Sequence, residues 1–139
     1  MSTYDMQMEQ TMETKLFNAT VSFTPNAAPN TAVIALSGDI NAEAEARLST
    51  AYVEAERHDS PMVLLDFHNV NYINSTGIAL IVGLLARARK TKRRLMVSGL
   101  SGHYKEIFTI TRLADFMSIY DDTDTALADA AGNMIKVNG

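Results

Sequence analysis

Two adjacent hydroxyl side chains, Ser75 and Thr76, stand where a polar segment turns into a long apolar one. Residues 74–77 are Asn-Ser-Thr-Gly, and the apolar run IALIVGLLARAR follows at once. A hydroxyl at the start of a helix can accept a hydrogen bond from a free backbone N–H and so cap the helix. The same N–H groups and the positive end of the helix dipole also favour a phosphate at that place. On the residues alone, capping and phosphorylation both stay open.

Other residue types that could do chemistry are absent or scattered. The chain has no cysteine, which excludes disulfides, thiol catalysis and cysteine-ligated metals. Its histidines, His58, His68 and His103, are far apart and lack zinc-ligand spacing. There is no glycine-rich phosphate loop, and no nucleophile and base stand together near the hydroxyl pair. We therefore expect no catalytic residue, no metal and no cofactor, and a small α/β enzyme is the weakest interpretation.

Composition predicts one ordinary globular domain. The chain has 139 residues, of which 47% are apolar and 20% charged. No apolar run approaches the ~20 residues that cross a bilayer, and the first residues do not resemble a secretory signal. We expect a flexible leader over 1–15, a single domain over 16–139, and a cytoplasmic protein with no membrane contact. The net charge of −4 argues against direct nucleic-acid binding.

Strands and helices are predicted to alternate along the chain. Asn41 is expected to cap the helix that follows it. Short apolar runs rich in β-branched residues predict strands over 16–23, 31–37, 61–67, 95–100 and 116–120. Runs of helix formers predict helices over 42–57, 75–91, 101–113 and from 122 or 123 onward. This order favours an α/β fold with a mixed, mostly parallel sheet of about five strands and about four helices. The polar segment 68–77 would then be a loop at the carboxyl end of a central strand, where open α/β sheets place their sites.

The predicted helix 75–91 is apolar around nearly its whole circumference. A rotation of ~100° per residue places one set of side chains on the sheet: Ile78, Ile81, Val82 and Leu85. A second set then points away from the sheet or lies on the flank: Ala79, Leu80, Gly83, Leu84 and Arg87. This second set is either a stray exposed leucine with its neighbours, or a surface that binds a partner. A charge at Leu80 would then abolish binding with little loss of stability.

The segment 87–94, RARKTKRR, contains half of the twelve basic residues. A solvated helix end is one interpretation, because cations suit the negative end of the helix dipole. A rim of charge that steers an acidic partner is another. No aromatic residue interleaves the run, which argues against nucleic acid.

The strand, loop and helix over 62–89, MVLLDFHNVNYINSTGIALIVGLLARAR, resemble the STAS domain, and more narrowly the anti-sigma factor antagonists of bacterial partner-switching systems. The family motif is aspartate, serine, serine or threonine, and glycine, which here is Asn74-Ser75-Thr76-Gly77. The segment LSGDIN at 36–41 resembles the family's glycine-acid loop. Residues 95–127 resemble its closing strand, helix, strand and helix. The resemblance covers about residues 16–135.

The resemblance implies a mechanism. An unphosphorylated antagonist captures an anti-sigma factor, typically a serine kinase of the histidine-kinase-like ATPase fold, and so frees a sigma factor. The kinase phosphorylates the motif serine, here Ser75 with Thr76 second, and the complex dissociates until a serine/threonine phosphatase resets it. A phosphate would place about −1.5 to −2 charges beside the apolar helix and so end an apolar contact. The resemblance and the helix phase together predict partner contacts at Asp39, Asn41, Asn74, Thr76, Gly77, Ala79, Leu80, Gly83, Leu84 and Arg87.

The chain departs from the family motif at two amides. Asn74 and Asn41 stand where acidic residues are usual, and Asp39 remains as the nearby acid. Loss of two carboxylates lowers the repulsion against a phosphate, whereas an acid beside the serine could help the kinase orient its substrate. The alternative is therefore a STAS scaffold or regulator in another bacterial signalling complex that does not act on a sigma factor.

Overall fold

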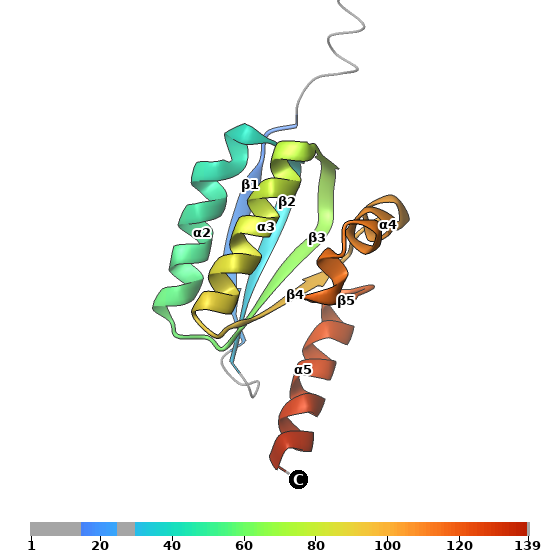
Figure 1. Cartoon of the computed structure of the whole chain (residues 1–139). Coiled ribbons are helices and arrows are strands. Elements are labelled where there is room, and N and C mark those ends of the chain that lie inside the picture. The colour runs from blue at the N-terminus through green and yellow to red at the C-terminus, as the bar shows by residue number, and fades with distance from the viewer. Residues whose placement is uncertain (1–14, 25–29, 139) are drawn as a thin grey trace, which may run out of the picture.

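The computed structural model describes residues 15–24 and 30–138, with side chains described up to Gly132 (Figure 1). The predicted leader lies outside the described residues except for Lys15. The side chain of Ile135, in the predicted terminal helix, also lies outside them.

A five-stranded sheet forms the centre of the molecule. Its strands lie side by side in chain order, β1 to β5. β1 is antiparallel to β2, and the remaining pairs are parallel. The strands are β1 (Asn18–Phe23), β2 (Thr31–Ile40), β3 (Met62–Ile73), β4 (Arg94–Ser98) and β5 (Ser118–Tyr120). The mixed, mostly parallel sheet expected from the sequence is confirmed.

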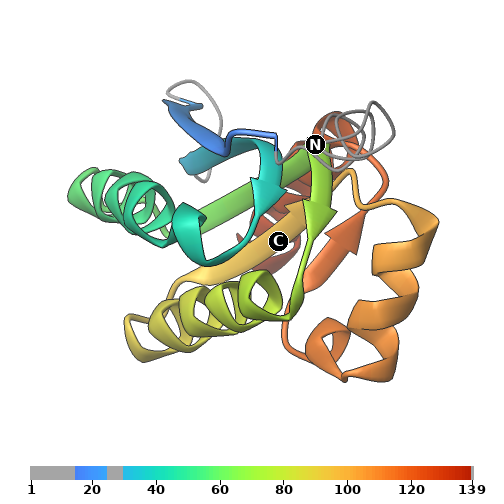
Figure 2. The same cartoon turned by 90° about the horizontal axis from the view of Figure 1, so that it is seen from above.

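The helices cover the two faces of the sheet unequally. α2, α3 and α4 lie on one face and α5 on the other (Figures 1 and 2). The helical segments are η1 (Ala42–Ala44), α2 (Glu45–Arg57), α3 (Ser75–Lys90), α4 (Gly102–Ile110), η2 (Leu113–Asp115) and α5 (Thr123–Asn138). Four α-helices were expected, and α4 ends earlier than predicted. Within the described residues, none of these helices is both long and apolar enough to cross a membrane.

Two hydrophobic clusters hold the layers together. The larger lies between the sheet and α2, α3 and α4, and the smaller lies under α5, where Met62, Leu64 and Met96 meet Ala126 and Ala130. A stripe of residues on η1 and α2 recurs at the spacing of three to four residues that predicts the buried face of a helix, and all of it is buried: Ala44, Leu48, Ala51, Tyr52 and Ala55. Asn41 accepts the Glu43 N–H at 2.9 Å, which confirms it as the cap of η1.

Two central strands are longer than predicted. β3 continues to Ile73, because it keeps pairing with β2 up to Ile40 after its pairing with β4 has ended at Asp66. β2 continues through Gly38, where φ is +82° and an added Cβ would lie 2.2 Å from the Leu16 carbonyl oxygen. The expected loop over 68–77 is therefore mostly strand, and a single residue links β3 to α3.

Candidate functional site

Asn74 makes the turn from β3 into α3. Its N–H donates to the Ile40 carbonyl at 3.2 Å, and its side-chain oxygen accepts the Gly77 N–H at 2.8 Å. Asn74 is therefore the cap of α3. Ser75, the first residue of the helix, is exposed, and its hydroxyl has no hydrogen-bond partner among the described residues. The capping interpretation of Ser75 is thus wrong, because Asn74 takes that role.

Gly77 lets the start of α3 touch the end of β2. An added Cβ would lie 2.1 Å from the Ile40 carbonyl oxygen and 2.9 Å from a methyl group of Ile73. Both neighbours belong to the central sheet, and the nearer atom is backbone, which cannot rotate away. Gly77 therefore faces the sheet and helps to fix the rotation of α3 about its axis.

We expect Gly77→Ala to shift the start of α3 and to lower the free energy of unfolding by about 2 kcal/mol, as overpacking in a core does. Chemical denaturation measures the loss. Gly83→Ala is the matched control, because a Cβ at Gly83 meets nothing within 4 Å and alanine favours a helix. Equal stability of the two variants would contradict the tight contact at Ile40.

Tyr104 holds the same junction from the other side. Its hydroxyl accepts the Ile73 N–H at 2.8 Å and donates to the Ile73 carbonyl at 3.3 Å. The ring of Tyr104, on α4, is buried. β4 pairs with β3 only as far as Asp66, so no strand pairs with Ile73 on that side of β3. A side chain thus makes hydrogen bonds here of the kind that a neighbouring strand would make, directly before Asn74 and Ser75.

We expect Tyr104→Phe to lower the free energy of unfolding by about 2 kcal/mol, because it leaves the buried Ile73 N–H without a partner. Amide exchange, which NMR follows residue by residue, should accelerate at Ile73 and Asn74. Unchanged exchange at these two amides would contradict the positioning role of Tyr104.

The outer face of α3 is made of small and apolar side chains. Ser75, Ala79, Val82, Gly83 and Ala86 are all exposed, and Val82 is 42% exposed. Their spacing of three and four residues places them on one face of a helix. We call these five residues the α3 surface. It begins at the hydroxyl of Ser75 and has no polar side chain in its next three turns.

The rotation of α3 differs from the predicted one. Leu84 was expected to face a partner and is 7% exposed, while Val82 was expected to pack on the sheet and is exposed. Leu80 is half-buried and packs against the core. The helix is turned by roughly 65° from the prediction, taking ~100° per residue. Gly77 sets this rotation through its contact with Ile40.

The other predicted contact residues divide by exposure. Asp39 is 8% exposed and accepts from the Lys15 N–H at 2.9 Å and the Asn71 amide at 3.1 Å. Asp39, Gly77 and Leu84 are therefore interior, which corrects their assignment to a partner surface. Asn41 and Asn74 are half-buried, and Thr76 is exposed.

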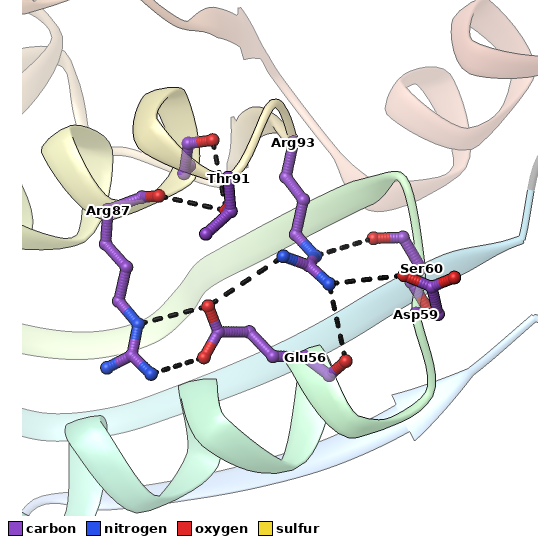
Figure 3. A network of polar contacts seen from close by, with 7 residues as sticks. Glu56, Asp59, Ser60, Arg87, Thr91 and Arg93 are labelled. Atoms are coloured by element: carbon purple, nitrogen blue, oxygen red, sulfur yellow. Dashed lines mark hydrogen bonds and ion pairs between the residues drawn. The ribbon is translucent and has the colours of Figure 1, made fainter.

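Arg87 is exposed, and its side chain contacts α2. Its guanidinium pairs with Glu56 through two hydrogen bonds, one at 3.1 Å from Nε, and lies 5.4 Å from the centre of the Tyr52 ring (Figure 3). Arg93 reaches the same carboxylate at 3.9 Å and the Ser60 carbonyl at 3.1 Å. Burial, with a smaller contribution from Glu56, raises the pKa of Tyr52 to about 12. Arg87 and Arg93 thus fasten α2 to α3 on the side away from α4.

Carboxylates from β3 and from the segment that follows β5 line one hollow. Asp66 accepts the His68 N–H at 2.9 Å, and Asp121 pairs with Lys105. Asp122 accepts the Thr125 N–H at 2.7 Å, which holds the pKa of that carboxyl below its usual range. Each of these carboxylates has an internal partner. Within residues 15–24 and 30–138, no three histidine or acidic side chains are placed to hold a metal ion.

Comparison with known proteins adds a family and a fold. The family model described as Mlab, STAS domain, matches residues 23–120. A curated relative, the anti-sigma-B factor antagonist of Staphylococcus epidermidis, is 26% identical over 91 residues, which are 66% of this chain and 84% of the relative.

Two solved structures share the fold. An anti-sigma factor antagonist from Mycobacterium paratuberculosis aligns with a TM-score of 0.69 at 17% identity, over 83% of this chain and 94% of its own. The Bacillus cell fate determinant SpoIIAA in the phosphorylated form aligns with a TM-score of 0.59 at 16% identity, over 79% of this chain and 98% of its own.

Proposed function

The chain belongs to the STAS domain family, and from that premise we propose that it is an anti-sigma factor antagonist whose binding is switched by phosphorylation of Ser75. Its relative in Staphylococcus epidermidis is named for the same role. The observation that carries the proposal is the free, exposed hydroxyl of Ser75 at the start of the α3 surface. In the unphosphorylated chain this surface is open to a partner.

A phosphate on Ser75 is compatible with the fold. Among the described residues, the N–H groups of Ser75 and Thr76 have no acceptor, and the helix dipole adds positive potential there. Asp39, the remaining nearby acid predicted from the sequence, accepts hydrogen bonds from the Lys15 N–H and the Asn71 amide. The phosphate can therefore be held at the helix start without displacing α3.

The same phosphate is incompatible with an apolar partner on the α3 surface. It carries about −1.5 to −2 charges at neutral pH, and a partner packed over Ala79 and Val82 would have to desolvate it. Phosphorylation thus ends the contact while the fold persists. The partner is an anti-sigma factor with serine kinase activity, and a serine/threonine phosphatase restores the binding form.

Incubation of the full chain with purified candidate anti-sigma factor kinases and ATP, followed by mass mapping, tests the proposal. We expect label on Ser75 and loss of the complex as label accumulates. Ser101 is the internal control: it is also exposed at a helix start, but its hydroxyl caps α4 by accepting the Tyr104 N–H. Absence of label with every kinase, or label at Ser101 in place of Ser75, would favour the scaffold alternative.

A further inference from the structure

The two flanks of α3 face different neighbours. At ~100° per residue, Ser75, Val82 and Arg89 lie along one flank, and Arg87 lies on the other. Arg87 contacts α2 through Glu56, whereas Arg89 contacts Phe116 at the end of η2. The flank that begins at Ser75 therefore runs toward η2 over roughly 21 Å, at 1.5 Å per residue.

An exposed aromatic side chain ends this flank. Phe116 is 53% exposed, and the Arg89 guanidinium carbon lies 4.8 Å from the centre of its ring. Beside the pair is a hollow of about 380 Å³ with a mixed lining. Leu85, Leu95 and Met117 are its other apolar residues, and Arg93, Arg94, Asp115 and Ser118 line it as well. Phenylalanine and arginine are both enriched in protein interfaces, and arginine also in binding hot spots.

The end of α3 nearest this hollow carries unbalanced positive charge. Arg87, Arg93 and Arg94 each pair with a carboxylate. Arg89, Lys90 and Lys92 have none within ion-pair distance among the described residues. The free charge therefore lies at the end of the flank opposite to Ser75.

We propose that the docking surface for the anti-sigma factor extends from Ser75 along this flank to the Arg89–Phe116 pair. The segment that occupies it is acidic and apolar: an apolar side chain packs on the exposed ring of Phe116, and carboxylates face Arg89, Lys90 and Lys92. This inference rests on the proposed function, and it adds a second anchor to the one at the α3 surface.

The two ends of α3 would then act on different steps of binding, namely association and release. Charge at the far end attracts an acidic partner and speeds its association, as complementary charge does at protein interfaces. The hydroxyl at the near end decides whether the partner stays. A phosphate on Ser75 lies too far from Arg89 to be neutralised by it. The positive charge at one end of α3 therefore does not prevent the phosphate at the other end from releasing the partner.

The test measures affinity and association rate for the anti-sigma factor kinase that binds the chain most tightly in the kinase panel. We expect Phe116→Ala to raise Kd at least about tenfold. Arg89→Glu should slow association and reduce its dependence on salt. The matched control is Arg57→Glu, because Arg57 is exposed in the last turn of α2 and unpaired among the described residues. Thermal unfolding of each variant checks that the fold is kept.

The outcomes separate this inference from the proposed function. Wild-type affinity and rate in both Phe116→Ala and Arg89→Glu would overturn the second anchor while leaving the Ser75 switch in place. An equal change in Arg57→Glu would overturn it as well, since the effect would then be one of net charge. Self-association of the chain that Phe116→Ala abolishes, with kinase binding unchanged, would assign the surface to a second copy. Failure of every kinase to bind would overturn both proposals.

Discussion

Ser75→Asp is expected to bind the anti-sigma factor at least about tenfold more weakly than the wild-type chain, while Ser75→Ala keeps wild-type affinity. A carboxylate at the first residue of α3 would be desolvated when a partner covers the α3 surface, which costs about 1–3 kcal/mol or more for an unpaired charge. The alanine removes a hydroxyl that has no partner in the free chain, so it disturbs nothing. Isothermal titration calorimetry with the purified anti-sigma factor gives the affinities.

Ser75→Asn separates charge from size. Asparagine has the shape of aspartate without its charge, so it should bind more tightly than Ser75→Asp. Unfolding should show that Ser75→Asp is at least as stable as the wild type, since an acid in the first turn suits the helix dipole. Ser75→Asn should stay close to the wild type, since the side chain is exposed. Equal affinity of Ser75→Asn and Ser75→Asp would mean that bulk, and not charge, closes the surface.

Val82→Glu should reduce affinity for the anti-sigma factor by at least about a hundredfold, because it places a charge at the centre of an apolar contact. Its free energy of unfolding should stay within about 0.5 kcal/mol of wild type, since the side chain is 42% exposed. Titration calorimetry and chemical denaturation measure the two quantities on the same samples.

Two further variants make the result specific. Ala46→Glu adds the same charge to the exposed face of α2 and should leave affinity unchanged. Leu80→Glu should lose both affinity and stability, because Leu80 is half-buried against the core. If Val82→Glu bound as tightly as Ala46→Glu, the α3 surface would not be the docking site.

The alternation of strands and helices could be predicted because each element carries its own pattern. The stripe on α2 repeats every three to four residues among charged neighbours, so its buried face was evident. Residues 68–73 gave no such signal. They pair with β2 through the backbone while most of their side chains stay exposed, and the polar sequence therefore looked like a loop.

The start of α3 at Ser75 could be predicted, but the exposed face of the helix could not. α3 is apolar all round, so periodicity did not determine its rotation; the contact between Gly77 and Ile40 does, and it joins residues far apart in the chain. The freedom of the Ser75 hydroxyl likewise depends on Asn74 taking the cap. The Arg89–Phe116 pair joins two elements that only the folded chain brings together.

Direct comparison of the chain with and without a phosphate on Ser75 tests the central claim. Both forms are titrated with the same anti-sigma factor, and the amide spectrum of each is recorded by NMR. We expect affinity to fall at least about a hundredfold on phosphorylation, with amide shifts confined to the first turn of α3 and its contacts at Ile40 and Ile73. Undiminished affinity of the phosphorylated form, or a loss of affinity accompanied by shifts throughout the sheet, would contradict it.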